Sequence, residues 1–344
     1  MERRQDIDQL RGLAILLMIM VHAAATWTPE GASTTSLFAL IIAGLGGLAA
    51  PLFVTVGGWV TVQSTWTLQK ALTRFVFLLL AQILVNLSAP HLFDPYTPGV
   101  LSLFAILYLI APIWLRIAEN IAFCGTVLFG ICIVNWVLLH GDSSLGWNDR
   151  ITSNGFEIIN HLVLTGTYPV FPWIFFSILG AGINIHSPSI KQLGSIASIG
   201  LILCITILWD ALQKDVPFAQ PSGDASMTFF PANTPFLIGA CTGVLILWMM
   251  FERRNPYQGL NKLGRLSLTL YVVHFIPISL GSSFTPGWMY AVPLVLFYTV
   301  LWWPISVLHQ RRFSRYSLEH LLKRLSHHEE ERAHEGALSS HDML

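Results

Sequence analysis

The sequence predicts an all-α membrane protein, a polytopic bundle of about ten transmembrane helices with both termini in the cytoplasm. Only 11% of the 344 residues are charged and 53% are hydrophobic, whereas a soluble domain carries about 25% charged residues. Apolar runs of roughly the 20 residues needed to cross a bilayer core recur along almost the whole chain. These runs are continuous rather than alternating, which favours helices over a membrane barrel.

The apolar runs give ten spans. The second run is longer than one crossing requires and contains Pro51, Gly57 and Gly58, so we expect it to be tilted or broken. The predicted spans are residues 10–28, 35–62, 72–90, 98–116, 120–140, 164–186, 192–212, 234–251, 264–284 and 288–309.

The distribution of Lys and Arg predicts the orientation. With the N-terminus in the cytoplasm, 17 of the 19 basic residues fall in or beside inner segments, and only Arg150 and Lys214 fall outside. The positive-inside rule demands this bias. The net charge of zero therefore hides a strong asymmetry and gives no support for nucleic-acid binding. We expect a multi-pass protein of a bacterial or archaeal cytoplasmic membrane, embedded in the lipid bilayer, and a homo-oligomer is compatible with the sequence.

Residues 1–325 are expected to form one membrane domain, and residues 326–344 a disordered polar cytoplasmic tail. All four cysteines fall inside predicted spans, with no CxxC pair and no Cys/His zinc spacing, so we expect buried free thiols and no metal site. The cysteines are Cys124, Cys132, Cys204 and Cys241.

The first span carries the most informative residues, Arg11 and His22. Their separation of eleven residues corresponds to about three helical turns, so both lie on one face about 16 Å apart. Asp8 stands three residues before Arg11, a spacing that allows an ion pair. His22 lies in the outer half of the membrane, where an ionisable group usually faces a cavity or a partner. The alternative is a helix-packing histidine, with Arg11 as a positive-inside anchor.

A second polar stripe lies in the ninth predicted span. Ser267, Tyr271 and His274 follow each other at i, i+4 and i+7, so they share one helix face. His274 either completes a polar cavity with His22 or bonds to a neighbouring helix, and for His274 alone a structural role is favoured.

The sixth predicted span begins with two prolines and contains closely spaced glycines. Pro169 and Pro172 are expected to bend its entry, whereas Gly180 and Gly182 permit close helix packing. His161 lies just before this span and could meet a substrate from outside, although a solvated loop histidine is the favoured interpretation.

Several stretches resemble known membrane acyltransferases. RGLAILLMIMVH, an Arg followed after ten residues by His, resembles the signature of the acyltransferase-3 family. Three others resemble the catalytic-domain family of heparan-α-glucosaminide N-acetyltransferase and its bacterial relatives: APLFVTVGG, FPWIFFSILGAGI and LGRLSLTLYVVHF. RYSLEHLLKRL resembles the ending of related bacterial membrane proteins. The resemblance covers residues 6–325.

The resemblance implies a ten- or eleven-helix enzyme that takes an acyl group, usually acetyl, from cytoplasmic acyl-CoA and delivers it to a sugar or glycan on the far side. By the Arg-ten-His motif, His22 is the implied catalytic histidine and Arg11 its companion. In the branch around the lysosomal heparan-α-glucosaminide N-acetyltransferase, Asn stands at the position of His22, and the catalytic His lies beyond the first membrane helix. Residues 28–36 contain no His, which argues against heparan sulfate glucosamine as the acceptor.

We therefore expect acetyl-CoA, or another short acyl-CoA, as co-substrate and no metal. Its phosphates would meet Arg11, Arg74, Lys262 and Arg265, since basic side chains suit phosphates, although topology also explains each of them. His274 is the second catalytic candidate, and Asp8, Ser267, Tyr271 and His161 are the substrate-binding candidates.

The role of His22 and the class of protein both leave alternatives open. His22 could act as general base or as nucleophile through an acyl-histidine. The alternative function is a small-solute transporter or channel whose path the same polar stripes line. A receptor or scaffold has little support, because no sizeable soluble domain is evident.

Overall fold

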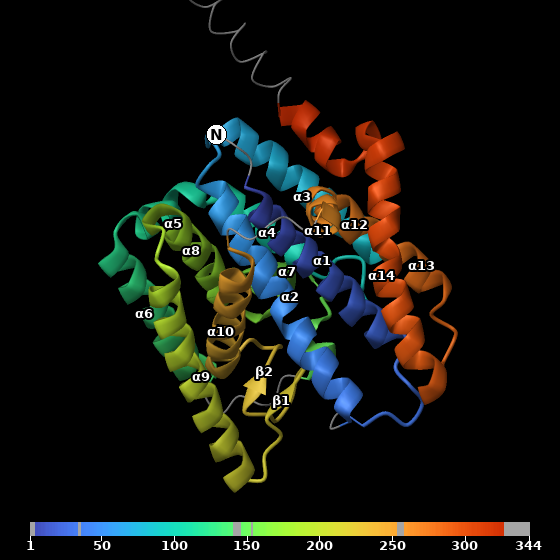
Figure 1. The fold of residues 1–344 in the computed structure, drawn as a ribbon, viewed down its shortest axis with the longest axis horizontal. Coiled ribbons are helices and arrows are strands. Elements are labelled where there is room, and N and C mark those ends of the chain that lie inside the picture. Colours follow the sequence, from blue (N-terminus) through green and yellow to red (C-terminus); the bar gives the residue numbers. More distant parts are fainter. Residues whose placement is uncertain (1–3, 34–35, 140–145, 153, 253–257, 327–344) are drawn as a thin grey trace, which may run out of the picture.

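A computed structural model describes residues 4–33, 36–139, 146–152, 154–252 and 258–326. The described chain is helical almost throughout, and its two strands of two residues each form one parallel pair (Figure 1). The helices are α1 (Gln5–Thr26), α2 (Leu37–Thr61), α3 (Leu68–Ser88), α4 (Val100–Leu109), α5 (Ala111–Glu119), α6 (Ile121–Leu139), η1 (Trp147–Arg150), α7 (Gly155–Asn160), η2 (His161–Thr165), α8 (Val170–His186), α9 (Ile190–Gln213), α10 (Thr234–Phe251), α11 (Gln258–Arg265), α12 (Ser267–Val273), α13 (Phe275–Leu280), α14 (Trp288–Arg312) and η3 (Ser314–Tyr316), and the strands are β1 (Ala219–Gln220) and β2 (Met227–Thr228).

The number of membrane spans agrees with the sequence. Seven described helices are long and apolar enough to cross a membrane, and the number rises to ten if each of three bent helix pairs is one span. The all-α, polytopic fold is thereby confirmed. The predicted tail lies outside the described residues from position 327 onward.

The bent pairs correspond to the fourth, sixth and ninth predicted spans. α4 and α5 meet at 74°, and Pro112 stands in the first turn of α5, where proline is tolerated because that turn needs no amide donor. The segment α7–η2 meets α8 at 44°, with Pro169 as the N-cap of α8 and non-helical backbone at Phe171, as the two prolines of this span predicted. α11 meets the segment α12–α13 at 75°.

The second predicted span is one continuous helix. α2 runs unbroken for 25 residues and contains Pro51, so of the two expected alternatives, a tilt or a break, the break does not occur. The hydroxyl of Thr55 donates to the carbonyl oxygen of Pro51 at 2.8 Å, which adds a bond in the turn that follows the proline.

Helix α1 forms the centre of the bundle. It packs against α2, α11 and α14, and it is more buried within the protein than the other single helices of membrane length. A Cβ atom on Gly264 of α11 would lie 1.8 Å from the carbonyl oxygen of Asp8. A Cβ on Gly180 of α8 would lie equally close to that of Thr55 on α2. These two contacts require glycine and allow the helix backbones to touch.

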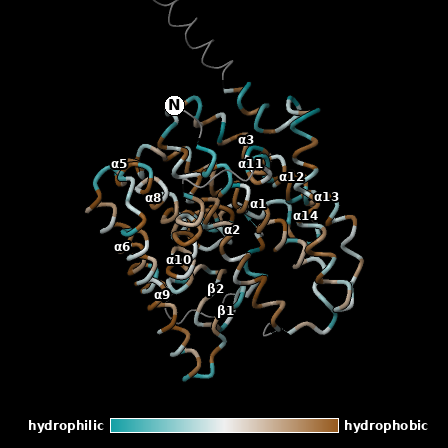
Figure 2. Tube along the Cα trace, in the orientation of Figure 1, coloured by the Kyte–Doolittle hydropathy of each residue, from teal (hydrophilic) through white to brown (hydrophobic). Residues whose placement is uncertain are grey.

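The bundle has two distinct ends. Residue 4 and the last described residues, 318–326, lie at the same end, together with the start of α3 (Figure 1). Hydrophilic residues gather there in the hydropathy view, whereas the helix bodies between the ends are largely hydrophobic (Figure 2). We call this the basic end, because it carries Arg11, Lys70, Arg74 and Lys323, which line one common pocket.

Candidate functional site

The structure brings the two membrane histidines into contact. His22 lies on α1, and His274 follows the last residue of α12. The Nδ1 atom of His22 is 3.0 Å from the Nε2 atom of His274, and the rings stack with centroids 5.2 Å apart. His274 is completely buried, whereas His22 remains partly exposed. Of the pair, His22 is the one that a substrate can reach.

The hydrogen bonds define which nitrogen of each ring carries a proton. The Nδ1 atom of His274 lies 2.8 Å from the carbonyl oxygen of Leu270. A carbonyl only accepts, so Nδ1 of His274 carries the proton and Nε2 of the neutral ring accepts. His22 must then donate from its own Nδ1 and keep a lone pair on Nε2. Within the described chain that Nε2 has no hydrogen-bond partner.

Aromatic rings surround the histidine pair. The Phe275 ring is centred 4.6 Å from the His22 ring, and Phe93 and Tyr271 are centred 6.3 and 6.4 Å away. The Tyr298 hydroxyl donates to the backbone carbonyl of His274 at 2.5 Å, which satisfies an acceptor at the junction of α12 and α13. The rings restrict the orientations of His22 and keep its surroundings apolar.

Phe93 reaches His22 because the loop between α3 and α4 is tied down. The side-chain amide of Asn86, near the end of α3, donates to the carbonyl oxygens of Pro95 and Thr97 at 3.0 and 2.8 Å. Asn86 is itself buried, so these bonds also satisfy an otherwise costly polar group. Asn86 is thus a structural amide that fixes the loop.

Arg150 holds the same loop from the opposite side. Its guanidinium donates to the carbonyl oxygen of Leu92 at 2.8 Å and lies 4.4 Å from the ring centre of Trp147 and 6.0 Å from that of Phe93. Burial lowers the pKa of Arg150, and the charge of Asp94 partly opposes that effect. Arg150 is one of the two basic residues predicted on the outer side of the membrane, and the sequence analysis gave it no role, although this exception could have pointed to it.

A pocket of about 600 Å³ opens at the basic end. Its inner wall is apolar, and its charged lining consists of four basic side chains and one carboxylate. The lining residues used below are Arg11, Phe53, Lys70, Arg74, Leu78, Leu101, Phe104, Ser267, Glu319, Leu322, Lys323 and Ser326.

Two of the four basic residues that the sequence proposed for the acyl donor line this pocket. Arg11 and Arg74 belong to its lining, together with Lys70 and Lys323, which the sequence did not assign to the donor. The Arg74 guanidinium also stacks 5.1 Å from the ring centre of Tyr108. The sequence missed the two lysines because only the packing of α3 and of residues 318–326 brings them beside Arg11.

Lys262 and Arg265 lie on α11, outside the lining of this pocket. The Nε atom of Arg265 pairs with Asp8 at 3.3 Å, and the Lys262 carbonyl accepts a hydrogen bond from Gln310. The carboxylate that the sequence offered to Arg11 therefore pairs with Arg265 and fastens α1 to α11. The reason is the close approach at Gly264, which places the two helices side by side.

The remaining substrate-binding candidates do not lie together in one site. Ser267 lines the basic pocket, and Tyr271, one turn further along α12, contacts the rings of both histidines. His161 is buried in η2, and its Nδ1 bonds the Thr165 hydroxyl at 2.9 Å. The interpretation of His161 as a solvated loop histidine is therefore wrong, because His161 belongs to the helical turn η2, where its side chain is buried.

The cysteines carry free thiols, with Cys124 buried and the other three partly buried. Among the described residues, no three His, Cys, Asp or Glu side chains gather closely enough to hold a metal ion.

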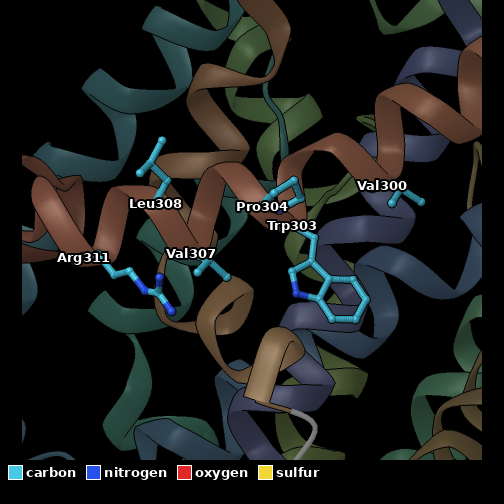
Figure 3. A pocket seen from close by; sticks show the side chains of 6 residues that line it. All are labelled: Val300, Trp303, Pro304, Val307, Leu308 and Arg311. Carbon is cyan, nitrogen blue, oxygen red and sulfur yellow. The ribbon is translucent and has the colours of Figure 1, made fainter.

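A second hollow of about 530 Å³ lies along α14 (Figure 3). It is far more open than the basic pocket, and its lining is apolar apart from Arg311. Figure 3 shows Trp303 and Arg311 pointing to one side of the helix. The lining contains none of the site residues proposed from the sequence; the residues are Val300, Trp303, Pro304, Val307, Leu308 and Arg311.

Comparison with known families agrees with this arrangement. A family model described as an acyltransferase domain, that of the acyltransferase-3 family, matches residues 4–309. The match includes α1, the helix of Arg11 and His22, and α12. A comparison with curated proteins finds no match. Since the family model covers most of a chain that folds as a multi-pass membrane bundle, the protein belongs to the acyltransferase-3 family.

Proposed function

We propose that the protein transfers an acetyl or other short acyl group from cytoplasmic acyl-CoA to a sugar or glycan on the opposite side of the membrane. The family match supports a membrane acyltransferase. The observation that carries the proposal is the hydrogen bond between His22 and His274, which leaves a proton-free Nε2 on a partly exposed ring. Both chemical routes of acyl transfer need such a nitrogen.

The donor would bind in the basic pocket. The phosphates of the donor would meet Arg11, Lys70 and Arg74. The apolar wall of the pocket would receive the less polar arm of the donor, which carries the thioester. Arg11 stands about 16 Å from His22 along α1, so a long extended donor is needed to bridge the two. A compact acyl donor would not span this separation.

In the general-base route, Nε2 of His22 takes the proton from an acceptor hydroxyl or amine. The acceptor atom then bonds to the thioester carbonyl carbon, and the carbon–sulfur bond breaks. The CoA sulfur leaves as thiolate and regains a proton from the imidazolium or from water. His274 supports this route, since its Nε2 holds the Nδ1 proton of His22 and so stabilises the imidazolium that forms.

In the nucleophilic route, Nε2 of His22 attacks the thioester carbonyl and CoA leaves as thiolate. The acyl group then resides on His22 until the acceptor hydroxyl or amine attacks its carbonyl carbon. The bond between that carbon and Nε2 breaks, which restores the free imidazole, and the acceptor proton passes to the CoA thiolate or to water. In this route, the hydrogen bond from Nδ1 of His22 to Nε2 of His274 becomes stronger as positive charge develops on the His22 ring. The geometry supports both routes equally.

The acceptor would approach from the end opposite the basic pocket. The acceptor would pass the loop that carries Phe93, which lies beside His22, and the η1 turn with Trp147 and Arg150, which lies beside Phe93. The resemblance to glycan-modifying acetyltransferases supports a sugar acceptor. The positive-inside rule supports a cytoplasmic basic end, because it places the basic segments on that side.

Release of free CoA from acetyl-CoA by the purified protein tests the proposal. The assay uses a thiol reagent, envelope glycans as acceptor and His22→Ala as the matched control, and mass spectrometry detects the acylated sugar. We expect acceptor-dependent release by the wild-type protein and none above background by the variant. Equal release by both proteins, or no release with any acyl-CoA, would contradict the proposal and favour the transporter alternative.

A further inference from the structure

The segment after α14 forms a wall of the basic pocket. Residues 318–326 are helical and lie beyond the part of the chain that the family model matches, residues 4–309. Four of them line the pocket at positions i, i+3, i+4 and i+7, so a single helix face is turned toward it. These residues are Glu319, Leu322, Lys323 and Ser326.

Glu319 fixes this segment to the start of α12. One carboxylate oxygen accepts from the backbone amides of Leu268 and Thr269 at 2.8 and 3.1 Å, and the other accepts from the Thr269 hydroxyl at 2.5 Å. The same hydroxyl accepts from the amide of Leu318 at 2.9 Å. A carboxylate at a helix N-terminus is also favoured by the helix dipole. The segment is therefore docked on α12, the helix that immediately precedes His274.

This docking leaves the pocket positively charged. Among the described lining residues Glu319 is the one acidic side chain, and α12 already engages both of its oxygens. Four cations share the space, and Lys323 is the exposed one at the mouth. A compact ammonium on a flexible stem suits binding of a phosphate as a point charge.

We infer that residues 318–326 form part of the donor site and that Lys323 binds a phosphate of the acyl-CoA. The inference rests on the proposed function and extends it to a segment that the family match does not reach. Leu322 closes the apolar wall, and Glu319 acts as a positioning residue that holds Lys323 at the mouth. The next residue, Arg324, is exposed and does not belong to the lining, so it provides a matched control of equal charge.

The test is calorimetric titration of CoA into the full-length protein in detergent, beside a melting curve for every variant. We expect Lys323→Gln to weaken CoA binding about three- to tenfold, the range for one charge-assisted contact. Lys323→Arg keeps the charge and should stay within about twofold of the wild-type affinity, as should Arg324→Gln. Lys323→Ala is the second variant if Lys323→Gln does not fold.

Two results would overturn the inference: wild-type affinity in Lys323→Gln, or an equal loss in Arg324→Gln. Failure of the wild-type protein itself to bind CoA would instead remove the donor that the proposed function assigns. The two failures are therefore distinguishable, because failure of the inference leaves CoA binding by the wild-type protein in place, whereas failure of the proposed donor removes it.

Discussion

The ring of His22 lies nearly parallel to that of His274, with an angle of 17° between their planes. The His22 ring is partly exposed and the His274 ring is buried, so under the proposed function the pair divides into a reacting group and a group that orients it. The chain of donors runs from Nδ1 of His22 to Nε2 of His274 and from Nδ1 of His274 to the carbonyl of Leu270. Each histidine can therefore be tested for a different effect.

Replacing His22 by Ala should abolish acyl transfer while leaving folding and CoA binding largely intact. The reason is the loss of the free Nε2, and a general acid–base group contributes about 10²–10⁴-fold. The measurement is turnover at saturating acetyl-CoA beside a melting curve. His91→Gln provides a control on the loop near His22, because His91 is exposed and bonds Thr26. Full turnover by folded His22→Ala protein would end the catalytic assignment.

Replacing His274 by Ala should lower kcat about two- to tenfold and change the KM for acetyl-CoA little. The lost hydrogen bond is worth about 0.5–1.5 kcal/mol, and about 1.4 kcal/mol corresponds to a factor of ten in rate. His274→Gln should recover part of the rate, because its amide oxygen can accept from Nδ1 of His22. A purely structural histidine would show equal thermal destabilisation in both variants and an unchanged kcat per folded molecule.

The sequence predicted the parts of this site that lie on one helix and offered the meeting of His22 with His274, which the structure shows, but it missed the other contacts between helices. The shared face of Arg11 and His22 follows from helical periodicity alone. The partner of Asp8 does not follow from periodicity, because the choice between Arg11 and Arg265 depends on how closely α1 approaches α11. Lys323 was invisible for the same reason: nothing in the sequence shows that residues 318–326 fold back onto the start of α12. The bend at α4 and α5, by contrast, had a visible cause in Pro112.

Replacing Arg74 by Ala should raise the KM for acetyl-CoA several-fold and leave kcat nearly unchanged, since a phosphate contact distant from the reacting atoms contributes uniform binding. Lys262→Ala is the control, because Lys262 lies outside the pocket lining. The measurement is steady-state kinetics at two ionic strengths, where the effect of Arg74 should shrink as salt screens the charge. An equal rise of KM in Lys262→Ala would show that the donor binds elsewhere.

Cysteine labelling of intact cells tests the predicted orientation. Single cysteines are introduced near Asp149 and Gly223 and near Asn255 and Ser326, in a background without the four native cysteines. An impermeant reagent should modify the first two positions and not the last two, because the basic end is predicted to face the cytoplasm. Labelling of Asn255 or Ser326 from outside would reverse the topology, and with it the side from which the donor enters.

Replacing Gly264 by Ala should destabilise the bundle, because the new Cβ would lie 1.8 Å from the carbonyl oxygen of Asp8. That atom belongs to the backbone, so α11 must move away from α1, and overpacking of this kind costs about 1–3 kcal/mol. The melting temperature in detergent should fall. Gly125→Ala on α6 is the control, since apart from its chain neighbours and the backbone of its own helix no described atom would lie within 4 Å of its Cβ, and alanine favours a helix interior by up to ~1 kcal/mol. Its melting temperature should stay equal or rise. Unchanged stability of Gly264→Ala would show that α1 and α11 are not in backbone contact, and the Asp8–Arg265 pair would then lose its structural basis.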